Sequence, residues 1–261
     1  MSHNRKKTAA AFLVLGFLAA CSPAPPPAPT PAPAEQAKKA SQPDNWYNLK
    51  TEEISLDTGV GGGPSLTRNF YFILDGSGSM GEKPGGSCSG DQRFPTKMDG
   101  ARWAVAEFLK QVPQDVNIGM IAFDNNGLGE RVPLGPGNHE RFLQTANAIQ
   151  VGGGTPLNKA IHLATQKLVA QYQRQLGYGE YRLVVVTDGQ AREIPEAALF
   201  AARHGMPIYT IGLCIGPEHA LRQFSVSYRA ADNFADLAAS LGETLAELPS
   251  FDVATFDEPN P

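Results

Sequence analysis

NFYFILDGSGS, residues 69–79, is the most informative segment of this 261-residue chain. Its first part, from Phe70 to Leu74, is a continuous run of apolar residues. Such a run is typical of a strand buried on both faces of a sheet, because a strand with one solvated face alternates apolar and polar residues. After Asp75, glycine and serine alternate as far as Ser79. The segment therefore predicts a central strand that delivers polar side chains to one end of a sheet.

Segments with the apolar pattern of strands alternate along the chain with segments that have the periodicity of helices. We expect further strands at residues 116–123, 181–187 and 207–213, with a short edge strand at 131–134. We expect helices at residues 101–112, 140–149, 157–176, 195–204 and 234–248. This alternation predicts an α/β fold with a doubly wound, mainly parallel sheet flanked by helices.

The length and the 42% hydrophobic content suit one well-packed core rather than two. We expect a leader over residues 1–20, a tether and linker over 21–67, one folded domain over 68–250 and a tail over 251–261. The leader joins Arg5-Lys6-Lys7 to an apolar run that is too short for a stable membrane-spanning helix. Residues 23–33 are almost wholly proline and alanine, which favours a stiff spacer, and plain disorder fits the same composition.

The leader ends in Leu18-Ala19-Ala20-Cys21, which resembles the lipobox of bacterial lipoproteins. The resemblance implies that Cys21 is acylated, becomes the new N-terminus and holds the protein in a lipid bilayer. The expected location is the bacterial cell envelope, at the outer membrane or the periplasmic face rather than in the cytoplasm. The alternative is an ordinary secretory signal that happens to contain a cysteine.

Charge excludes one class of partner. The formal net charge is −4, and loss of the leader's three basic residues leaves 19 basic against 26 acidic residues, a balance of about −7. Because nucleic-acid binding relies on basic surfaces, this acidic balance argues against nucleic acid as a partner. The cysteines number 3, which are too few for a disulfide scaffold and include no Cys-x-x-Cys pair for zinc.

Short oxygen-bearing side chains occupy three glycine-rich loops next to the predicted strands and helices. They are Asp75, Ser77 and Ser79, then Thr155, then Asp188. In a parallel sheet these loops share the edge beyond the carboxyl ends of the strands, so we expect the five side chains to gather there, with Asp75 and Asp188 at a loop edge and not in the core. Oxygen donors of this kind suit hard divalent cations such as Mg²⁺. Each loop alone would pass as an ordinary turn, but the three together favour a metal site.

The pattern Asp75-x-Ser77-x-Ser79, followed by Thr155 and Asp188, resembles the metal-ion-dependent adhesion site (MIDAS) of von Willebrand factor type A (VWA) domains. The resemblance covers roughly residues 68–248. It implies that the two serines, and often the threonine, contact Mg²⁺ or Mn²⁺ directly, while the two aspartates frequently act through water. It also implies a binding protein, not an enzyme, whose protein partner offers an Asp or Glu carboxylate to the metal.

Three alternatives compete with this interpretation. Gly76-x-Gly78-x-x-Gly81 also fits a dinucleotide fingerprint, but Pro84 and two glycines follow where a helix should open. A serine hydrolase could use Ser77 or Ser79, although neither lies in a Gly-x-Ser-x-Gly motif. A scaffold of the same fold that has lost its metal is the third.

The chain departs from the family pattern by an insertion, residues 81–95, between the serine loop and its helix. Cys88 lies in this insertion, and Cys214 follows the strand at 207–213, so both are expected near the carboxyl edge of the sheet. An exported protein can keep disulfides. A Cys88–Cys214 bridge that pins the insertion over the site and a buried free Cys214 beside a mobile loop are equally consistent with the sequence.

Overall fold

The computed structural model describes residues 64–90, 93–189, 193–215 and 218–245, together with Ile54 and Ala191. The expected leader, its Cys21, the proline-rich tether and the tail at 251–261 lie outside the described residues. Ile54 and residues 64–67 belong to the range assigned to the linker. Ile54 is nevertheless partly buried against the core, and Gln175 donates a hydrogen bond from Nε2 to the carbonyl oxygen of Ser65 at 2.8 Å.

The described strands form one sheet in the order β3-β2-β1-β4-β5-β6. Their bounds are β1 (Arg68–Asp75), β2 (Asn117–Asp124), β3 (Gly127–Gly135), β4 (Glu180–Thr187), β5 (Ile208–Leu213) and β6 (Ser227–Ala231). Every neighbouring pair is parallel except β2 and β3, which form a hairpin. The sheet is therefore mainly parallel, as the alternation of strand and helix patterns predicted.

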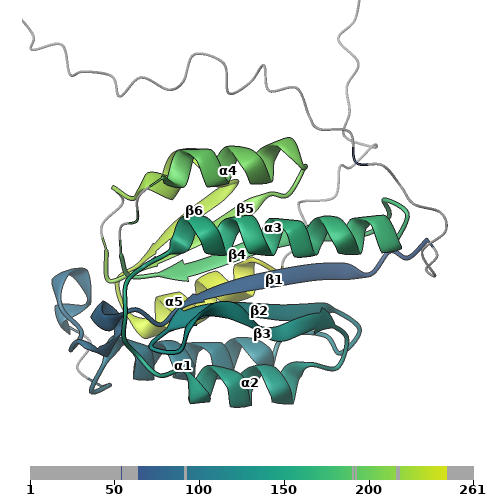
Figure 1. The fold of residues 1–261 in the computed structure, drawn as a ribbon. Helices are drawn as coiled ribbons and strands as arrows, with labels where there is room; N and C mark the ends of the chain where they lie inside the picture. The colour runs from purple at the N-terminus through teal and green to yellow at the C-terminus, as the bar shows by residue number, and fades with distance from the viewer. Residues whose placement is uncertain are drawn as a thin grey trace, which may run out of the picture. The chain divides into compact units, whose positions relative to one another are not determined.

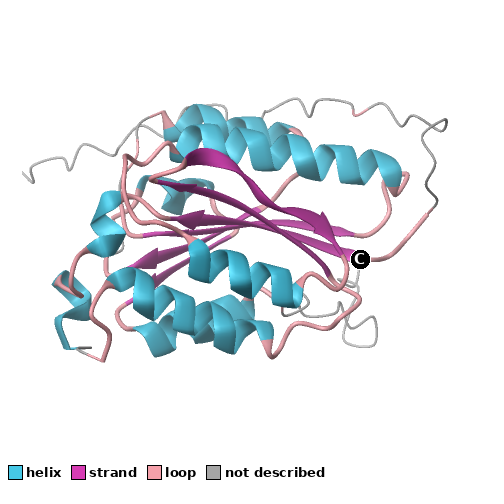
Figure 2. Cartoon of the chain, turned by 60° about the horizontal axis from the view of Figure 1, so that its bottom comes forward, coloured by secondary structure: helices cyan, strands magenta, loops and turns pink. Residues whose placement is uncertain are grey.

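Helices cover both faces of this sheet (Figure 1). One face carries α1 (Lys97–Leu109), α2 (His139–Ala148) and α5 (Phe234–Glu243), and the other carries α3 (Leu157–Arg174) and α4 (Ile194–Arg203). Figure 2 shows the strands enclosed between these two helical layers. Short 3-10 helices lie at η2 (Gly78–Gly81), η3 (Gly86–Gly90) and η4 (Ala220–Phe224). The fold is a doubly wound α/β sandwich, which confirms the predicted fold class.

The continuous apolar run in β1 is explained by burial on both faces. Phe70 and Phe72 enter the core beneath α1, α2 and α5, whereas Tyr71 and Ile73 enter the core beneath α3 and α4. The ring of Phe72 packs edge-on against Phe108 of α1 at 5.3 Å between centroids. Each such buried side chain contributes about 1.5–3 kcal/mol by leaving water. The apolar core therefore holds the carboxyl end of β1 in a fixed place.

Three expectations differ from the structure. The helix expected from Ala101 begins at Lys97, because the Thr96 hydroxyl accepts a hydrogen bond from the Asp99 backbone at 3.1 Å and caps it. The short edge strand is the longer β3, and the last helix ends at Glu243 rather than at residue 248. Strand β6 was not predicted, because its side chains show no apolar alternation and only Ala231 is buried.

Candidate metal-binding site

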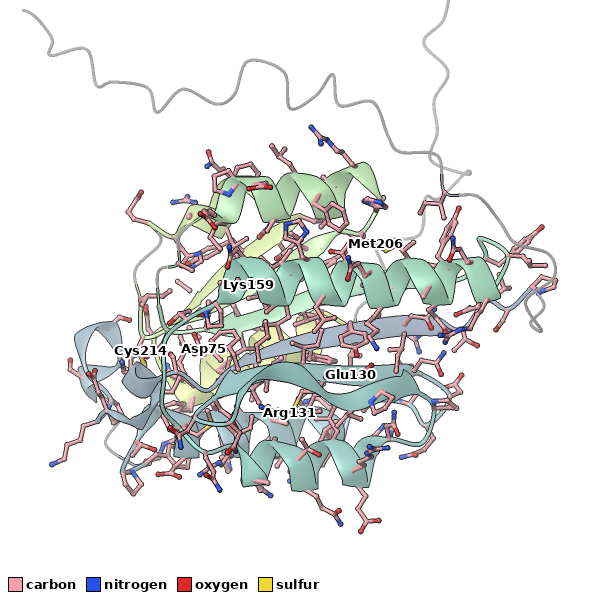
Figure 3. The ribbon with its side chains drawn as sticks, viewed as in Figure 1. Asp75, Glu130, Arg131, Lys159, Met206 and Cys214 are labelled. Carbon is pink, nitrogen blue, oxygen red and sulfur yellow. A yellow bond between two sulfur atoms is a disulfide. The ribbon has the colours of Figure 1, made fainter. Side chains whose placement is uncertain are left out.

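The candidate site lies where the strand order reverses. From β1 the chain continues to β2 on one side of the sheet, while β4 and β5 follow on the other side. The register pairs Leu74 with Val186, so Asp75 at the end of β1 reaches the end of β4. Doubly wound sheets bind ligands in the crevice at such a switch point. Figure 3 shows Asp75 and Cys214 at this same end of the sheet.

Asp75 is held between the two strand ends. One carboxylate oxygen, Oδ1, accepts a hydrogen bond from the Ser77 backbone at 2.8 Å, and Oδ2 accepts one from the Thr187 hydroxyl at 2.6 Å. The residue is fully buried. Burial raises the pKa of the Asp75 carboxyl above its ordinary value, although the hydrogen bonds from Ser77 and Thr187 partly oppose this and nearby Asp188 adds to it. A positive charge near Asp75 would therefore stabilise its ionised form.

Close backbone approach brings the glycine-rich loops together. A Cβ at Gly76 would lie 2.8 Å from the carbonyl oxygen of Phe123, which only glycine avoids. The Gly78 amide donates to the carbonyl oxygen of Gly153 at 3.1 Å, and the Gly152 amide donates to that of Gly76 at 2.9 Å. These bonds fix the loop that carries Thr155 against the loop that carries the serines.

The serines form a chain of polar contacts that ends on Asp188. The Ser79 hydroxyl donates to Asp188 Oδ1 at 2.8 Å, and the oxygens of Ser77 and Ser79 lie 3.2 Å apart, within hydrogen-bonding distance. The other carboxylate oxygen of Asp188, Oδ2, lies 2.9 Å from the ammonium of Lys97. The Asp188 side chain is 0% exposed and that of Lys97 is 12% exposed.

Thr155 lies next to the turn that follows Asp188, and His219 holds that turn in place. The hydroxyl oxygen of Thr155 lies 3.8 Å from the position of a Cβ built on Gly189, the residue after Asp188. His219 Nε2 donates to the carbonyl oxygen of Gly189 at 2.9 Å, while Nδ1 accepts from the Leu221 amide at 3.0 Å. The buried imidazole thereby holds the turn beside Asp188.

The structure brings all five predicted residues to one edge of the sheet, and four of them, Asp75, Ser77, Ser79 and Asp188, share hydrogen bonds along the loop. The expectation that the aspartates lie outside the core was wrong. Asp75 is 0% exposed and Asp188 is 6% exposed, because the packed loops cover both carboxylates. Lys97 was missed altogether, since a lysine in sequence looks like a solvated helix residue.

The donor set fits a divalent cation. Within the residues that the structure describes, no three His, Cys, Asp or Glu side chains gather as a metal cluster. Two carboxylates with two or three hydroxyls form a different set, in which every donor is oxygen, as Mg²⁺ and Mn²⁺ prefer. The ammonium of Lys97 on Asp188 also shows that a cation can be accommodated at this carboxylate.

Neither competing enzyme interpretation gains support from this geometry. A dinucleotide site needs a helix that opens near Gly81, but the chain passes through η3 and α1 begins only at Lys97. A serine hydrolase needs a base beside the hydroxyl, but in the described part of the chain Ser77 and Ser79 form hydrogen bonds with each other, with Asp75 and with Asp188.

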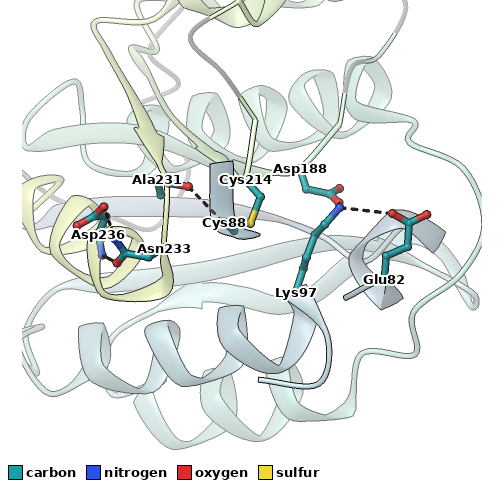
Figure 4. Close-up of a disulfide and its surroundings, with 8 residues drawn as sticks. All are labelled: Glu82, Cys88, Lys97, Asp188, Cys214, Ala231, Asn233 and Asp236. Atoms are coloured by element: carbon teal, nitrogen blue, oxygen red, sulfur yellow. Dashed lines mark hydrogen bonds and ion pairs between the residues drawn. A yellow bond between two sulfur atoms is a disulfide. The ribbon is translucent and has the colours of Figure 1, made fainter. Parts of the chain in front are cut away.

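A disulfide joins the insertion to the sheet. Cys88 and Cys214 are bonded at 2.03 Å between sulfurs, with 4.9 Å between their Cα atoms (Figure 4). Cys88 belongs to η3 and Cys214 follows β5, so the bond ties the insertion to the edge that carries the site. Of the two arrangements left open by the sequence, the structure has the bridged one.

A family model described as von Willebrand factor type A domain matches residues 70–190, which run from β1 to just past Asp188. The chain contains a von Willebrand factor type A domain. Such domains are typically adhesion or interaction modules rather than enzymes. Comparison with curated proteins finds no match.

Solved structures share the type A fold at low sequence identity. A pilus adhesin, SpaC from Lactobacillus rhamnosus GG, is 17% identical, with a TM-score of 0.53 over 70% of this chain and 31% of that chain. The manganese-loaded TRAP protein of Plasmodium vivax is 17% identical, with a TM-score of 0.51 over 70% and 75%. The conserved hypothetical protein BatB from Bacteroides thetaiotaomicron is 18% identical, with a TM-score of 0.50 over 67% and 98%. This chain thus spans about a third of the adhesin and nearly all of BatB.

None of the helices in the described part of the chain has the length and apolar character needed to cross a bilayer.

Proposed function

We propose that this type A domain binds Mg²⁺ or Mn²⁺ at the edge of its sheet and uses the metal to hold a protein partner through an Asp or Glu carboxylate. Ser77, Ser79 and Thr155 are the proposed direct ligands. Asp75 and Asp188 are proposed to act largely through water and to supply the negative charge.

The observation that carries this proposal is the convergence of Ser77, Ser79 and Asp188 through hydrogen bonds of 3.2 and 2.8 Å. These residues lie in the loops that follow β1 and β4, far apart in sequence, and they meet at one edge of the sheet. A structural purpose alone would not need two carboxylates so close together, since their repulsion opposes folding.

The chemistry of the donor set supports a partner with an acidic side chain. Hydroxyl ligands donate no negative charge, so a divalent cation bound there stays electrophilic and attracts a further carboxylate. The hydrogen bonds from Ser77 and Thr187 orient the Asp75 carboxylate and leave its negative charge unneutralised. The solved pilus adhesin and the manganese-loaded TRAP protein share this fold, which agrees with adhesion and metal binding but identifies no partner.

The same proposal places the domain on a tether in the bacterial cell envelope, with acylated Cys21 in the bilayer. Its support is the sequence of the leader, which ends in Ala19-Ala20-Cys21, and the proline-rich segment that follows. A stiff spacer of this kind would hold the binding edge away from the membrane surface.

The metal proposal is tested by calorimetric titration of the purified chain with Mn²⁺, in the wild type, in Ser79→Ala and in Ser87→Ala. Ser79→Ala should weaken binding by about tenfold or more, since even outer partners of metal ligands are worth that much. Ser87 is an exposed serine of the insertion, so its alanine variant is the matched control. A folded wild-type protein that binds no divalent ion at millimolar concentration contradicts the proposal.

Partner capture tests the second half. Immobilised protein should retain a specific protein from detergent-solubilised host membranes in Mg²⁺ and release it in chelator, and Ser79→Ala should retain none. Capture that is equal in Mg²⁺ and in chelator, by a protein that does bind Mn²⁺, would leave the ion with a purely structural role.

A further inference from the structure

Lys97 occupies a position that helix formation does not explain. It is the first residue of α1, where the positive end of the helix dipole disfavours a cation. Its side chain is only 12% exposed, so the ammonium is largely withdrawn from water. Burying a lysine side chain is costly unless it is paired. Some other part of the molecule must therefore account for it.

The pairing partner is Asp188. The ammonium lies 2.9 Å from Asp188 Oδ2, and the fully covered carboxylate gives its other oxygen to the Ser79 hydroxyl. Within the described part of the chain, Lys97 thus supplies a positive charge beside two neighbouring buried carboxylates. Its backbone is fixed as well, because the Lys97 amide donates to the carbonyl oxygen of Glu82 at 2.9 Å.

A second carboxylate, that of Glu82, lies on the solvent side of the Lys97 ammonium. Glu82 Oε2 lies 3.6 Å from Lys97 Nζ, and the glutamate side chain is 68% exposed (Figure 4). The lysine therefore stands between a buried partner inside the site and an exposed partner outside it. A flexible lysine side chain can turn from one to the other without any change in the backbone.

We propose that Lys97 is a tethered cation that competes with the divalent metal for Asp188, and that Glu82 receives its ammonium when the metal binds. This inference rests on the proposed metal site. The physical reason is like-charge repulsion, since a divalent ion at the serine hydroxyls and an ammonium on Asp188 cannot both sit close to one carboxylate without cost. The lysine neutralises the site when metal is scarce and sets the metal concentration at which the site fills.

The test compares Mn²⁺ affinity by calorimetry in the wild type, Lys97→Met, Glu82→Gln and the double variant. Lys97→Met keeps the length of the side chain and removes its charge, so it should bind Mn²⁺ about tenfold more tightly or better. Glu82→Gln should bind more weakly than the wild type, because the displaced ammonium loses its negatively charged partner. In the Lys97→Met background the glutamate substitution should have no effect.

Lys110→Met is the matched control, because Lys110 follows the last turn of the same helix and pairs there with Glu107 at 2.6 Å. It should leave Mn²⁺ affinity unchanged. Without metal, Lys97→Met should also melt at a lower temperature than the wild type, and Mn²⁺ should raise its melting temperature by more. Glu82→Gln changes an exposed residue and keeps the test decisive should Lys97→Met fail to fold without metal.

The outcomes separate this inference from the metal site itself. Wild-type binding with equal affinity in Lys97→Met overturns the role of Lys97 and leaves the metal site standing. Binding by Lys97→Met but not by the wild type supports the inference and shows that the lysine has replaced the metal. Absence of binding in every folded variant overturns both.

Discussion

The hydroxyl of Thr187, the last residue of β4, donates a hydrogen bond to Asp75 Oδ2 at 2.6 Å and so joins the ends of the two central strands. Both residues are fully buried. The same hydroxyl oxygen accepts from the Gly189 amide at 3.2 Å. Thr187 was not recognised in the sequence as part of the site, yet it sets the orientation of Asp75.

Thr187→Val should destabilise the metal-free domain by about 1–3 kcal/mol, because a buried carboxylate and a buried amide each lose a partner. Thr187→Ser keeps the hydroxyl and loses one methyl group, so its loss should be smaller, about 0.8 kcal/mol. Urea unfolding in chelator at neutral pH measures both. A larger loss in Thr187→Ser than in Thr187→Val would show that the methyl group contributes more than the hydroxyl, and would contradict the role given to the hydroxyl.

Gly100 in α1 offers a case where two effects oppose each other. Alanine gains up to about 1 kcal/mol in helix propensity over glycine. A Cβ there, however, would lie 2.2 Å from the ring of Phe234 in α5, and forced overpacking costs about 1–3 kcal/mol. Gly100→Ala should therefore lower the free energy of unfolding in urea despite its better propensity.

The control is Gly242→Ala, in α5. A Cβ at Gly242 meets only the flexible end of Gln111, at 3.0 Å, so this variant should be neutral or slightly more stable. Combining Gly100→Ala with Phe234→Leu should cost less than the sum of the two single changes, since the smaller side chain relieves the overlap. A Gly100→Ala variant more stable than the wild type would refute the clash.

The Cys88–Cys214 bond joins two residues that are 126 positions apart in sequence. The chain segment between them contains strands β2 to β5. Removing it in the double variant Cys88→Ala/Cys214→Ala should cost about 2–5 kcal/mol of stability. Reducing agent should lower the melting temperature of the wild type and leave that of the double variant unchanged. The prediction is contradicted if reductant leaves the melting temperature of the wild type unchanged and if both cysteines, unfolded without reductant, react with a thiol-blocking reagent.

The central part of the fold was predictable because its signals are strong and local. The apolar runs of β1 and β4 are short and rich in β-branched and aromatic residues, which favours strands buried on both faces, and the loops that follow them carry polar residues in a distinctive order. In a parallel sheet, Asp75 and Asp188 fall at the same edge, and the pairing of β1 with β4 then brings them together. The five proposed metal residues follow from these few facts.

The remainder depended on contacts that sequence alone does not show. Strand β6 pairs with β5 at the edge of the sheet, and only one of its side chains is buried. Its sequence therefore shows no alternation of apolar and polar residues. The role of Lys97 depends on its contact with Asp188 at 2.9 Å, and the two residues are 91 positions apart in sequence. One local signal was missed, since Thr96 and Asp99 have the spacing of a helix cap and would have moved the start of α1 to Lys97.

Membrane attachment through Cys21 is expected to be lost in Cys21→Ala. The wild-type protein should fractionate with membranes and incorporate a palmitate analogue, whereas the variant should do neither, because a single thioether-linked lipid anchor has no other attachment site. Ser22→Ala changes the neighbouring residue, keeps the thiol and should behave as the wild type. An alanine variant that is processed and still fractionates with membranes would rule out the lipoprotein assignment.

Acid should weaken the domain through His219. Burial lowers the pKa of His219 below 6.5, with partial opposition from its bond to the Gly189 carbonyl, and its Nδ1 already accepts the Leu221 amide at 3.0 Å. Protonation at Nδ1 would break that bond and place a positive charge on a buried ring, where it loses contact with water. Because the folded pKa is lowered, the unfolded chain takes up the proton at the higher pH. The stability that His219 contributes is therefore complete above the unfolded pKa and is lost as the pH falls through the folded pKa.

His219→Gln tests this account, because a glutamine amide can both donate to the Gly189 carbonyl and accept from the Leu221 amide but cannot take up a proton. Urea unfolding from about pH 8 to about pH 5, on either side of the ordinary histidine pKa, should show a steeper loss of stability in the wild type than in the variant. His204→Gln is the matched control, since that histidine is partly exposed at the end of α4, where its Nδ1 lies 2.8 Å from the carbonyl oxygen of Phe200. Parallel curves for the wild type and His219→Gln would show that His219 is not the group whose protonation destabilises the fold.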